Sequence, residues 1–401
     1  MVTLDPATPW RERLCRIILR STAPRNGSTQ RSSSVADSTS ESREVNVANT
    51  GNIWSIVLAG GEGSRLSRIT AGPEGRPVPK QFCSVKGGPS LIRQALSRGR
   101  AVAGRSHTMV VVAEEHRRWW SAELVDHPVR NIVVQPCNRG TACGVLLPLM
   151  GVLARDPDAT VVVLPSDHVV ADEQTLLEAV RSATDHVQQE SDRLVLLGLE
   201  PEGPDTGLGW IARSSAAPHP VCGVSQFVEK PSQERAEEMV REGALWNSLI
   251  FAMRAWALFS LFQWALPWMT RMFDYALIDA DDGPPPERLS RLYDRLPIVD
   301  FSRAVLQEAG SEMRVVAVPP CGWTDVGTPE GIARCTRGCS RHYGNEEPAS
   351  DAAPLLDLAE ALHAYEERFG PDADWAHYDP SAVAGSAVCR QIPIGMTGAH
   401  R

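Results

Sequence analysis

The feature that most constrains this chain is a regular alternation, beginning at Ile53, of short β-branched runs with longer amphipathic segments. The short runs have the pattern of buried strands, and the segments between them have the spacing of helices. The expected strands are 53–60, 107–113, 131–136, 159–168 and 193–199, and the expected helices include 90–102, 141–156 and 174–187. This alternation predicts an α/β fold with a mostly parallel sheet covered on both faces. Ligands of such sheets bind past the carboxyl ends of the strands.

The flanking regions differ in composition from this central part. Residues 1–50 are rich in Ser, Thr and Arg and poor in large apolar residues, which predicts a disordered N-terminal tail. An organelle transit peptide is an alternative interpretation of the first twenty residues, but Asp5 and Glu12 weigh against it. We expect one folded domain over 51–342 and a C-terminal extension over 343–401, with one helix within 353–370.

Charge and cysteine content limit the class of partner. The net charge of −9 and the sequence pI near 5.6 argue against a nucleic-acid partner, but they allow a small anionic ligand in a local cationic pocket. Nine cysteines in a long chain favour unpaired thiols in a reducing cytoplasm. Cys321, Cys335, Cys339 and His342 leave a zinc site open as an alternative, although no C-x-x-C pair is present.

The most apolar long stretch, 245–269, could be mistaken for a membrane span. Asn247, Arg254, Gln263 and Pro267 interrupt it, so it lacks the roughly 20 apolar residues that a bilayer requires. We therefore expect a buried strand followed by a buried helix, and no membrane partner.

The first expected strand ends in a glycine-rich turn, "VLAGGEGSRL" at 57–66. Glycines let the backbone turn with its N–H groups free to point at phosphate oxygens. Arg65 can bind two oxygens of one phosphate with its planar guanidinium, and Lys80 adds a compact positive charge. The turn therefore predicts a site for a run of phosphates.

Two familiar phosphate-binding motifs do not fit this turn. Leu66 occupies the position of the third glycine of a dinucleotide-binding fingerprint, and no Gly-Lys-Ser/Thr sequence closes a Walker A loop. A glycine turn without any ligand stays open as an alternative on the loop alone.

The pattern from Leu58 to Phe82, L-A-G-G-x-G-x-R-L followed by P-K-Q-F, resembles the signature of the sugar-1-phosphate nucleotidyltransferases, and its ending is most similar to mannose-1-phosphate guanylyltransferases. Six further segments resemble that family in the same order along the chain: "QPCNRGTA" at 135–142, "LPSDH" at 164–168, "DTGLGWI" at 205–211, "FVEKP" at 227–231, "WNSLIF" at 246–251 and "CGWTDVGT" at 321–328. The resemblance covers roughly 53–335 and excludes both flanking regions.

The resemblance implies a Rossmann-like α/β fold with a mostly parallel mixed sheet flanked by helices, of the nucleotide-diphospho-sugar transferase type. It also implies transfer of a nucleotidyl group from GTP to a sugar 1-phosphate, most simply mannose 1-phosphate, with release of pyrophosphate. Such phosphoryl chemistry asks a protein mainly for positioning and charge neutralisation. No nucleophilic side chain is required.

Asp167 ends the expected strand 159–168, where a side chain points into the ligand crevice and a carboxylate oxygen suits Mg²⁺. A helix N-cap is the alternative role for this aspartate. By resemblance, Asp325 completes the Mg²⁺ site with Asp167. Arg65 is implied to bind the β- and γ-phosphates, and Lys80 the α-phosphate; together with Asp167 these form the implied catalytic set.

The remaining implied contacts divide between the two substrates. Lys230 is implied to hold the phosphate of the sugar substrate and Glu229 the sugar hydroxyls, while Gly140 and Thr141 would take part in the choice of base. The full implied sets are Leu58, Ala59, Gly60, Gly61, Gly63, Arg65, Gly140 and Thr141 for the nucleotide, and Gly209, Glu229, Lys230 and Asn247 for the sugar phosphate.

The sequence departs from the family pattern near the expected base and sugar positions. Leu249 stands where W-N-S-G-I-F has glycine, Cys143 where proline is common, and Leu208 where tyrosine is common, and 67–69 also differ. A leucine at 249 would crowd the sugar or force a changed backbone. The alternatives are therefore a catalytically inactive nucleotide-sugar-binding regulatory protein, or a nucleotidyltransferase for another sugar or base. A homo-oligomer is left open.

Overall fold

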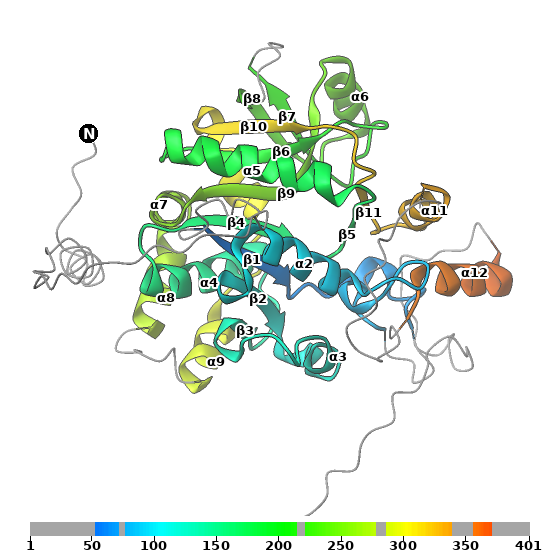
Figure 1. Cartoon of the computed structure of the whole chain (residues 1–401), viewed down its shortest axis with the longest axis horizontal. Helices are drawn as coiled ribbons and strands as arrows, with labels where there is room; N and C mark the ends of the chain where they lie inside the picture. The colour runs from blue at the N-terminus through cyan, green and yellow to red at the C-terminus, as the bar shows by residue number, and fades with distance from the viewer. Residues whose placement is uncertain (1–52, 72–76, 215–220, 278–285, 339–355, 371–401) are drawn as a thin grey trace, which may run out of the picture.

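A large mixed sheet with helices on both faces organises the molecule (Figure 1). The computed structural model describes residues 53–71, 77–214, 221–277, 286–338 and 356–370. The predicted tail 1–50, most of the predicted extension 343–401, and both Cys339 and His342 lie outside the described residues. The domain boundaries therefore stay predictions.

Within the described residues, nine strands form the main sheet in the order β3-β2-β1-β4-β9-β6-β10-β8-β7, and β5 pairs with β11 in a separate two-stranded sheet. The strands are β1 Ile53–Ala59, β2 Thr108–Ala113, β3 Ile132–Gln135, β4 Thr160–Pro165, β5 His168–Val169, β6 Leu194–Leu199, β7 Gly209–Arg213, β8 Val221–Glu229, β9 Leu245–Arg254, β10 Met313–Val318 and β11 Thr324–Asp325.

The sheet is mixed because β9 enters antiparallel between two parallel groups. Strands β3, β2, β1 and β4 are mutually parallel, and β6 is parallel to β10, whereas β9 runs antiparallel to both β4 and β6. The central strands β2, β4 and β6 are buried along their whole length, as expected for strands covered by helices on both faces. The predicted α/β class and mixed sheet are confirmed.

The helices lie between the strands along the chain. They are α2 Leu91–Ala103, α3 Arg117–Glu123, α4 Thr141–Arg155, α5 Glu173–Gln189, α6 Gln233–Arg241, α7 Ala255–Ala265, α8 Pro267–Leu277, α9 Pro286–Arg295, α10 Gln307–Ala309, α11 Pro329–Gly338 and α12 Leu358–Phe369, with short turns of helix at η1 Ser64–Leu66, η2 Lys80–Phe82, η3 Arg105–His107, η4 Glu114–His116, η5 Val129–Asn131, η6 Ser302–Leu306 and η7 Gly310–Glu312.

Two apolar clusters, one on each face of the sheet, form the core. Helices α2, α5 and α6 contribute to one cluster, together with the apolar residues of η2, α11 and α12. Helices α4, α7, α8 and α9 contribute to the other. Removing these apolar faces from water is the main force that holds the helices on the sheet.

The carboxyl ends of β1 and β4 lie at the same edge of the sheet. The two strands are parallel, with Leu58 opposite Pro165, so the glycine turn after β1 and the residues Ser166 and Asp167 after β4 emerge side by side. Across the small sheet His168 pairs with Asp325. The edge therefore collects polar segments from distant parts of the sequence.

The most apolar stretch, 245–269, forms strand β9, helix α7 and the first residues of α8. The predicted buried strand is confirmed, but the helix is buried on one face only, because Trp256 and Trp264 of α7 are 40% and 62% exposed. None of the helices that the structure describes has the length and apolar character needed to span a bilayer. The five expected strands and three expected helices correspond to β1, β2, β3, β4 with β5, β6, α2, α4 and α5.

Candidate active site

The glycine turn after β1 is held in place by two polar side chains. Gln81 donates from its amide nitrogen to the backbone oxygens of Ala59, at 3.1 Å, and Gly61, at 2.8 Å. Ser166 Oγ donates to the Leu58 oxygen at 2.6 Å. These bonds engage the last two carbonyl groups of β1 and the carbonyl group of Gly61 in the turn. They leave its conformation fixed without side chains covering Gly61, beside which an added Cβ would find open space.

Gly63 brings the turn into contact with the lysine-bearing segment. Its φ of +63° favours glycine, and an added Cβ would lie 3.0 Å from the Lys80 backbone nitrogen. A larger residue would therefore be strained twice, by its conformation and by crowding. Glycine at 63 is what allows Lys80 to approach the turn this closely.

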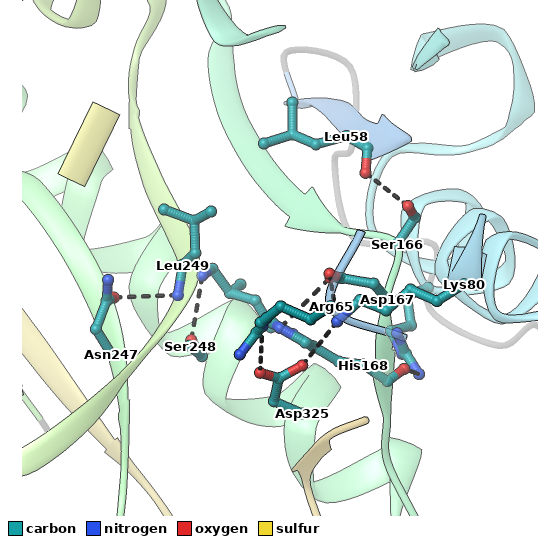
Figure 2. Close-up of polar contacts among 12 residues, drawn as sticks. Leu58, Arg65, Lys80, Ser166, Asp167, His168, Asn247, Ser248, Leu249 and Asp325 are labelled. Atoms are coloured by element: carbon teal, nitrogen blue, oxygen red, sulfur yellow. Dashed lines mark hydrogen bonds and ion pairs between the residues drawn. The ribbon is translucent and has the colours of Figure 1, made fainter. Parts of the chain in front are cut away.

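Four charged side chains predicted from the sequence converge at this edge (Figure 2). The Lys80 Nζ atom lies 2.9 Å from Asp167 Oδ2 and 2.9 Å from Asp325 Oδ1. Arg65 Nη2 donates to the other Asp325 oxygen at 3.2 Å. The two carboxylates therefore meet around one ammonium group, although they are far apart in the sequence.

Four different segments present these side chains, and Arg65 lies in η1, just after the glycine turn. Lys80 opens η2, directly after Pro79, which has an extended conformation. Asp167 follows β4, and Asp325 ends β11, whose pairing with β5 places it opposite His168. The positions are thus set by parallel strand ends on one side and by a short antiparallel pair on the other.

The charges strongly affect one another. Burial lowers the pKa of Lys80, but Asp167 and Asp325 raise it, and the net shift is upward. Burial raises the pKa of each carboxyl, but Lys80 first and His168 next outweigh it, so that both pKa values lie below the ordinary range; Arg65 adds to this effect for Asp325. The lysine is therefore cationic and both aspartates are anionic at neutral pH.

A cavity of about 250 Å³ opens beside this cluster. Its wall contains the charged side chains Arg65, Lys80 and Asp167 together with apolar side chains, a mixture that suits a ligand with phosphates and an apolar portion. The lining residues are Leu58, Gly61, Gly63, Arg65, Leu66, Lys80, Gln81, Thr141, Pro165, Ser166, Asp167, Leu249 and Gly327.

The two carboxylates form a suitable site for a divalent cation. They already hold one cationic group, Lys80 Nζ, between them. Mg²⁺ is commonly bound by one or two carboxylates, with substrate phosphates and water supplying the other ligands. Among the described residues no group of three or more His, Cys, Asp and Glu side chains is arranged to hold a metal. A magnesium ion would therefore depend on substrate oxygens here. The zinc alternative is not tested, because Cys339 and His342 lie outside the described residues.

The predicted base-side residues meet a segment from far along the chain. Gly140 has a φ of +85°, and an added Cβ would lie 2.3 Å from the Val299 oxygen. Thr141 lines the cavity, and its hydroxyl accepts a hydrogen bond from the Phe301 N–H at 2.8 Å. Segment 299–301 therefore supports the start of α4. This long-range contact could not be predicted from the sequence.

The four predicted sugar-side residues gather outside the cavity lining. An added Cβ on Gly209 would lie 2.7 Å from Glu229 Oε2 and 3.3 Å from Asn247 Cβ. Lys230 Nζ lies 3.4 Å from Glu229 Oε1. Burial, followed by the nearby Asp300, raises the pKa of Glu229, and Lys230 only partly opposes this. These residues form a second group, distinct from the charged cluster of Arg65, Lys80, Asp167 and Asp325.

Leu249 connects the two groups. Its N–H donates to Asn247 Oδ1 at 3.1 Å, and its side chain lines the cavity (Figure 2). Its φ of +56° is in the left-handed region that favours glycine, at a cost of about 1–2 kcal/mol for other residues. Leu249 therefore combines a backbone conformation that favours glycine with a position in the cavity wall, and crowding of a sugar there stays a prediction.

Three residues that shape the site were not predicted from the sequence to have a role in it. Gln81 and Ser166 anchor the glycine turn, as described above. Gly327 lies against Arg65, because an added Cβ would be 2.5 Å from its Nη2 atom. Gln81 lies inside the P-K-Q-F signature and Ser166 inside "LPSDH". Their positions directly beside Lys80 and Asp167 in the sequence could have identified them as site residues.

The sequence matches a known protein family and is similar to characterised proteins. The sequence profile of the family described as nucleotidyl transferase matches residues 54–340. The chain is similar to alginate biosynthesis protein AlgA of Pseudomonas syringae pv. tomato, with 32% identity over 282 residues, which is 68% of this chain and 56% of AlgA. It is also similar to mannose-1-phosphate guanylyltransferase of Escherichia coli K12, with 35% identity over 215 residues, 51% of this chain and 43% of that protein.

A similar solved structure is that of mannose-1-phosphate geranyltransferase from Thermus thermophilus, with a TM-score of 0.60 and 28% identity over 69% of this chain and 76% of that chain. The chain spans about half the length of the curated relatives it matches. The matched region contains the charged cluster and the cavity, and it ends before α12.

Proposed function

The chain belongs to the nucleotidyl transferase family, and we propose that it transfers the guanylyl group of GTP to a sugar 1-phosphate, giving a GDP-sugar and pyrophosphate. An oxygen of the sugar phosphate attacks the α-phosphorus of GTP. The new P–O bond forms as the bond between the α-phosphorus and the oxygen of the leaving pyrophosphate breaks. The names of the relatives favour mannose 1-phosphate as the sugar substrate.

The observation that carries this proposal is the convergence of Lys80, Arg65, Asp167 and Asp325 beside a glycine turn and a cavity. Lys80 is fixed by two carboxylates, so its ammonium group is ordered before a substrate arrives. In the proposed reaction it stabilises the charge that develops on the α-phosphate, and Arg65 binds the pyrophosphate portion. Preorganised charges of this kind are a main source of catalysis in phosphoryl transfer.

Asp167 and Asp325 would hold Mg²⁺. When bound, the ion would neutralise phosphate charge and orient the triphosphate. The N–H groups of the glycine turn would contact the phosphates, and Thr141 with Gly140 would lie on the side of the base. Two hard oxygen donors and a strongly anionic substrate make magnesium the expected cofactor.

Glu229, Lys230, Asn247 and Gly209 would bind the sugar phosphate. Lys230 supplies a cation next to the buried Glu229 carboxylate, and that carboxylate can accept hydrogen bonds from sugar hydroxyls. The two groups of residues lie next to each other through Leu249. A sugar phosphate bound at one and a nucleotide bound at the other would therefore be placed for reaction.

The test is pyrophosphate release by the purified full chain with Mg²⁺. GTP, ATP, UTP and dTTP are each paired with a panel of hexose 1-phosphates, and Asp167→Asn and Lys80→Met serve as site variants. Glu178→Gln, an exposed change on α5, is the matched control that should keep wild-type activity. Release with GTP that both site variants lose supports the proposal. Folded wild-type protein that releases no pyrophosphate with any pair contradicts it.

A second candidate function is a nucleotide-sugar-binding regulatory protein without turnover. The strained Leu249 in the cavity wall is the observation that favours it. Tight binding of a GDP-sugar by isothermal titration calorimetry, together with no pyrophosphate release by the wild type, would support this alternative. Release with a different nucleotide or sugar would instead identify a nucleotidyltransferase of other specificity.

We also propose a cytoplasmic location. The six cysteines that the structure describes, Cys83, Cys137, Cys143, Cys222, Cys321 and Cys335, are all in the thiol form and not in disulfides. Cysteines in the thiol form are typical of a reducing compartment. Thiol titration of protein purified without reductant checks this, because oxidised pairs would lower the number of reactive thiols under denaturing conditions.

A further inference from the structure

The segment 356–369 lies beyond the part of the chain that matches the family, yet it packs against the segments that carry the charged cluster. Leu356, Leu358, Ala361 and Leu362 are buried in the same apolar cluster as Phe82 of η2. In Figure 1, α12 lies near α11 at the side of the molecule where the strand ends meet. The segment is therefore part of the folded core.

The first contact of this segment is with the loop that follows Lys80. The Ser84 N–H donates to the Leu356 oxygen at 2.8 Å, and the Leu358 N–H donates to the Ser84 oxygen at 2.9 Å. Asp357 Oδ2 accepts from Ser84 Oγ at 2.9 Å and from the Gly87 N–H at 2.6 Å. Four hydrogen bonds thus fasten this loop to segment 356–369, and the buried Cys83 and Val85 side chains join the same apolar cluster.

Asp357 uses its two oxygens for different tasks. Oδ1 accepts from the Ala359 and Glu360 N–H groups and so caps α12. Oδ2 accepts the two hydrogen bonds from Ser84 and Gly87 in the 84–87 loop. The side chain is buried, and a carboxylate that accepts several N–H and O–H donors makes strong, charge-assisted bonds. One residue therefore couples formation of α12 to the position of the loop.

The held loop leads directly to Lys80. The Cys83 N–H donates to the Lys80 oxygen at 3.0 Å, and Lys80, Gln81 and Phe82 are all buried. This compact turn transmits the position of Ser84 to the lysine. A shift of the loop would move the Lys80 ammonium relative to its two carboxylates.

The second contact reaches the segment that carries Asp325. Helix α12 packs on α11, and α11 begins just after the Asp325 strand. Gly331 of α11 lies so close to this strand that an added Cβ would be 2.3 Å from the backbone oxygen of Asp325. Segment 356–369 therefore braces both sides of the Lys80–Asp325 contact.

We propose that segment 356–369 is a positioning element of the active site. Asp357 is its positioning residue: it fixes the 84–87 loop, and through that loop η2 with Lys80, relative to the strand that carries Asp325. The kinetic part of this inference rests on the proposed function, whereas the structural part does not. Misplacement of a catalytic group by a fraction of an ångström to an ångström can cost on the order of 10- to 100-fold in rate.

The experiment compares the full chain with Asp357→Ser. Serine retains an N-cap oxygen for α12 but cannot also supply the second oxygen to Ser84 and Gly87. Glu367→Gln, on the exposed side of α12, is the matched control. Hydrogen exchange followed by mass spectrometry reports on peptides covering 80–87, 325–332 and 356–369, and pyrophosphate release gives kcat and KM.

We expect Asp357→Ser to speed exchange in 80–87 at least about tenfold while the control does not, and to lower kcat about 10- to 100-fold with KM for GTP nearly unchanged. Faster exchange confined to 356–369, with 80–87 at the wild-type rate, overturns the inference, as does an unchanged kcat in an active enzyme. If the wild type releases no pyrophosphate, the proposed function fails and the exchange data alone decide. If Asp357→Ser does not fold, Ser84→Ala, which removes one of the four bonds, is judged by the same peptides.

Discussion

Replacement of Lys80 by methionine is the sharpest test of the charged cluster. Methionine keeps most of the length and apolar surface of the lysine stem, so the change removes the ammonium group with little loss of packing. The Lys80 side chain is only 7% exposed, and its Nζ contacts two carboxylates at 2.9 Å each. Without it, Asp167 and Asp325 would face each other with only Arg65 and His168 nearby.

The magnitude follows from the exposure of the three groups. Removing one partner of a buried ion pair costs about 3–5 kcal/mol, because the remaining charge stays buried. Asp325 is 15% exposed but Asp167 is 35% exposed, so solvent screens part of the unpaired charge. We therefore expect the free energy of unfolding at pH 7 to fall by about 2–4 kcal/mol, which lowers Tm by roughly 3–7 °C for a folded unit of this size.

The pH dependence has a definite sign. In the wild type both carboxyls have pKa values below the ordinary 3.8, so their contribution to stability is present above about pH 4 and is lost as the pH falls through the lowered values. In the variant, Lys80 no longer counteracts the burial that raises the carboxyl pKa values. The carboxyls then take up protons as the pH falls, and this removes the free-energy cost of their buried charges. The stability difference between wild type and variant should therefore shrink from pH 7 to pH 4.

The assay is urea unfolding followed by tryptophan fluorescence, with EDTA present, at pH 7 and pH 4. Arg93→Met is the matched control, because it removes a cation with one recorded carboxylate partner, Glu123, away from the cavity. A loss below 1 kcal/mol at pH 7, or the same loss at both pH values, would falsify the view that Lys80 neutralises two ionised carboxylates.

Three further perturbations test other parts of the site. Leu249→Gly should relieve about 1–2 kcal/mol of backbone strain and enlarge the cavity, so that kcat/KM for mannose 1-phosphate rises at least about threefold while KM for GTP changes little; an equal change for every sugar tested would argue against a role in sugar selection. Glu229→Gln should raise Tm at pH 8 but not at pH 4, because a carboxyl whose folded pKa is raised loses its stabilising contribution as the pH increases; a pH-independent effect in thermal unfolding would contradict the raised pKa. Gln81→Met removes two hydrogen bonds to the turn at Ala59 and Gly61, so the Kd of GTP measured by calorimetry should rise about 5- to 30-fold; an unchanged Kd would mean that the turn holds its shape without Gln81.

Much of the fold was accessible from local patterns. The strands β1, β2 and β4 and the helices α2 and α5 have a hydrophobic periodicity that does not depend on distant contacts. That alternation predicts parallel strands whose carboxyl ends share one edge of the sheet, which made the strand-end Asp167 a candidate. That β1 and β4 are neighbours is given only by the structure.

The antiparallel part of the sheet was not accessible in the same way. Strand β9 inserts between β4 and β6, and β8 lies beyond β10. Neither position is encoded by the local composition of these strands, because an apolar run pairs equally well in several places. The resemblance to the family supplied the mixed sheet, whereas periodicity alone predicted a mostly parallel one.

The sequence by itself determined that this chain forms helix-covered strands with a glycine turn, the cations Arg65 and Lys80 after that turn, and Asp167 at a strand end, since those signals depend on neighbouring residues. Asp325 was selected by the resemblance to the family. Only the tertiary structure decided that Asp167 and Asp325 share one ammonium group, that Leu249 keeps a glycine-like backbone, and that Asp357 holds the loop beyond Lys80. The physical reason is that these contacts join residues distant in sequence, and the geometry of such contacts is set by the packing of the whole core.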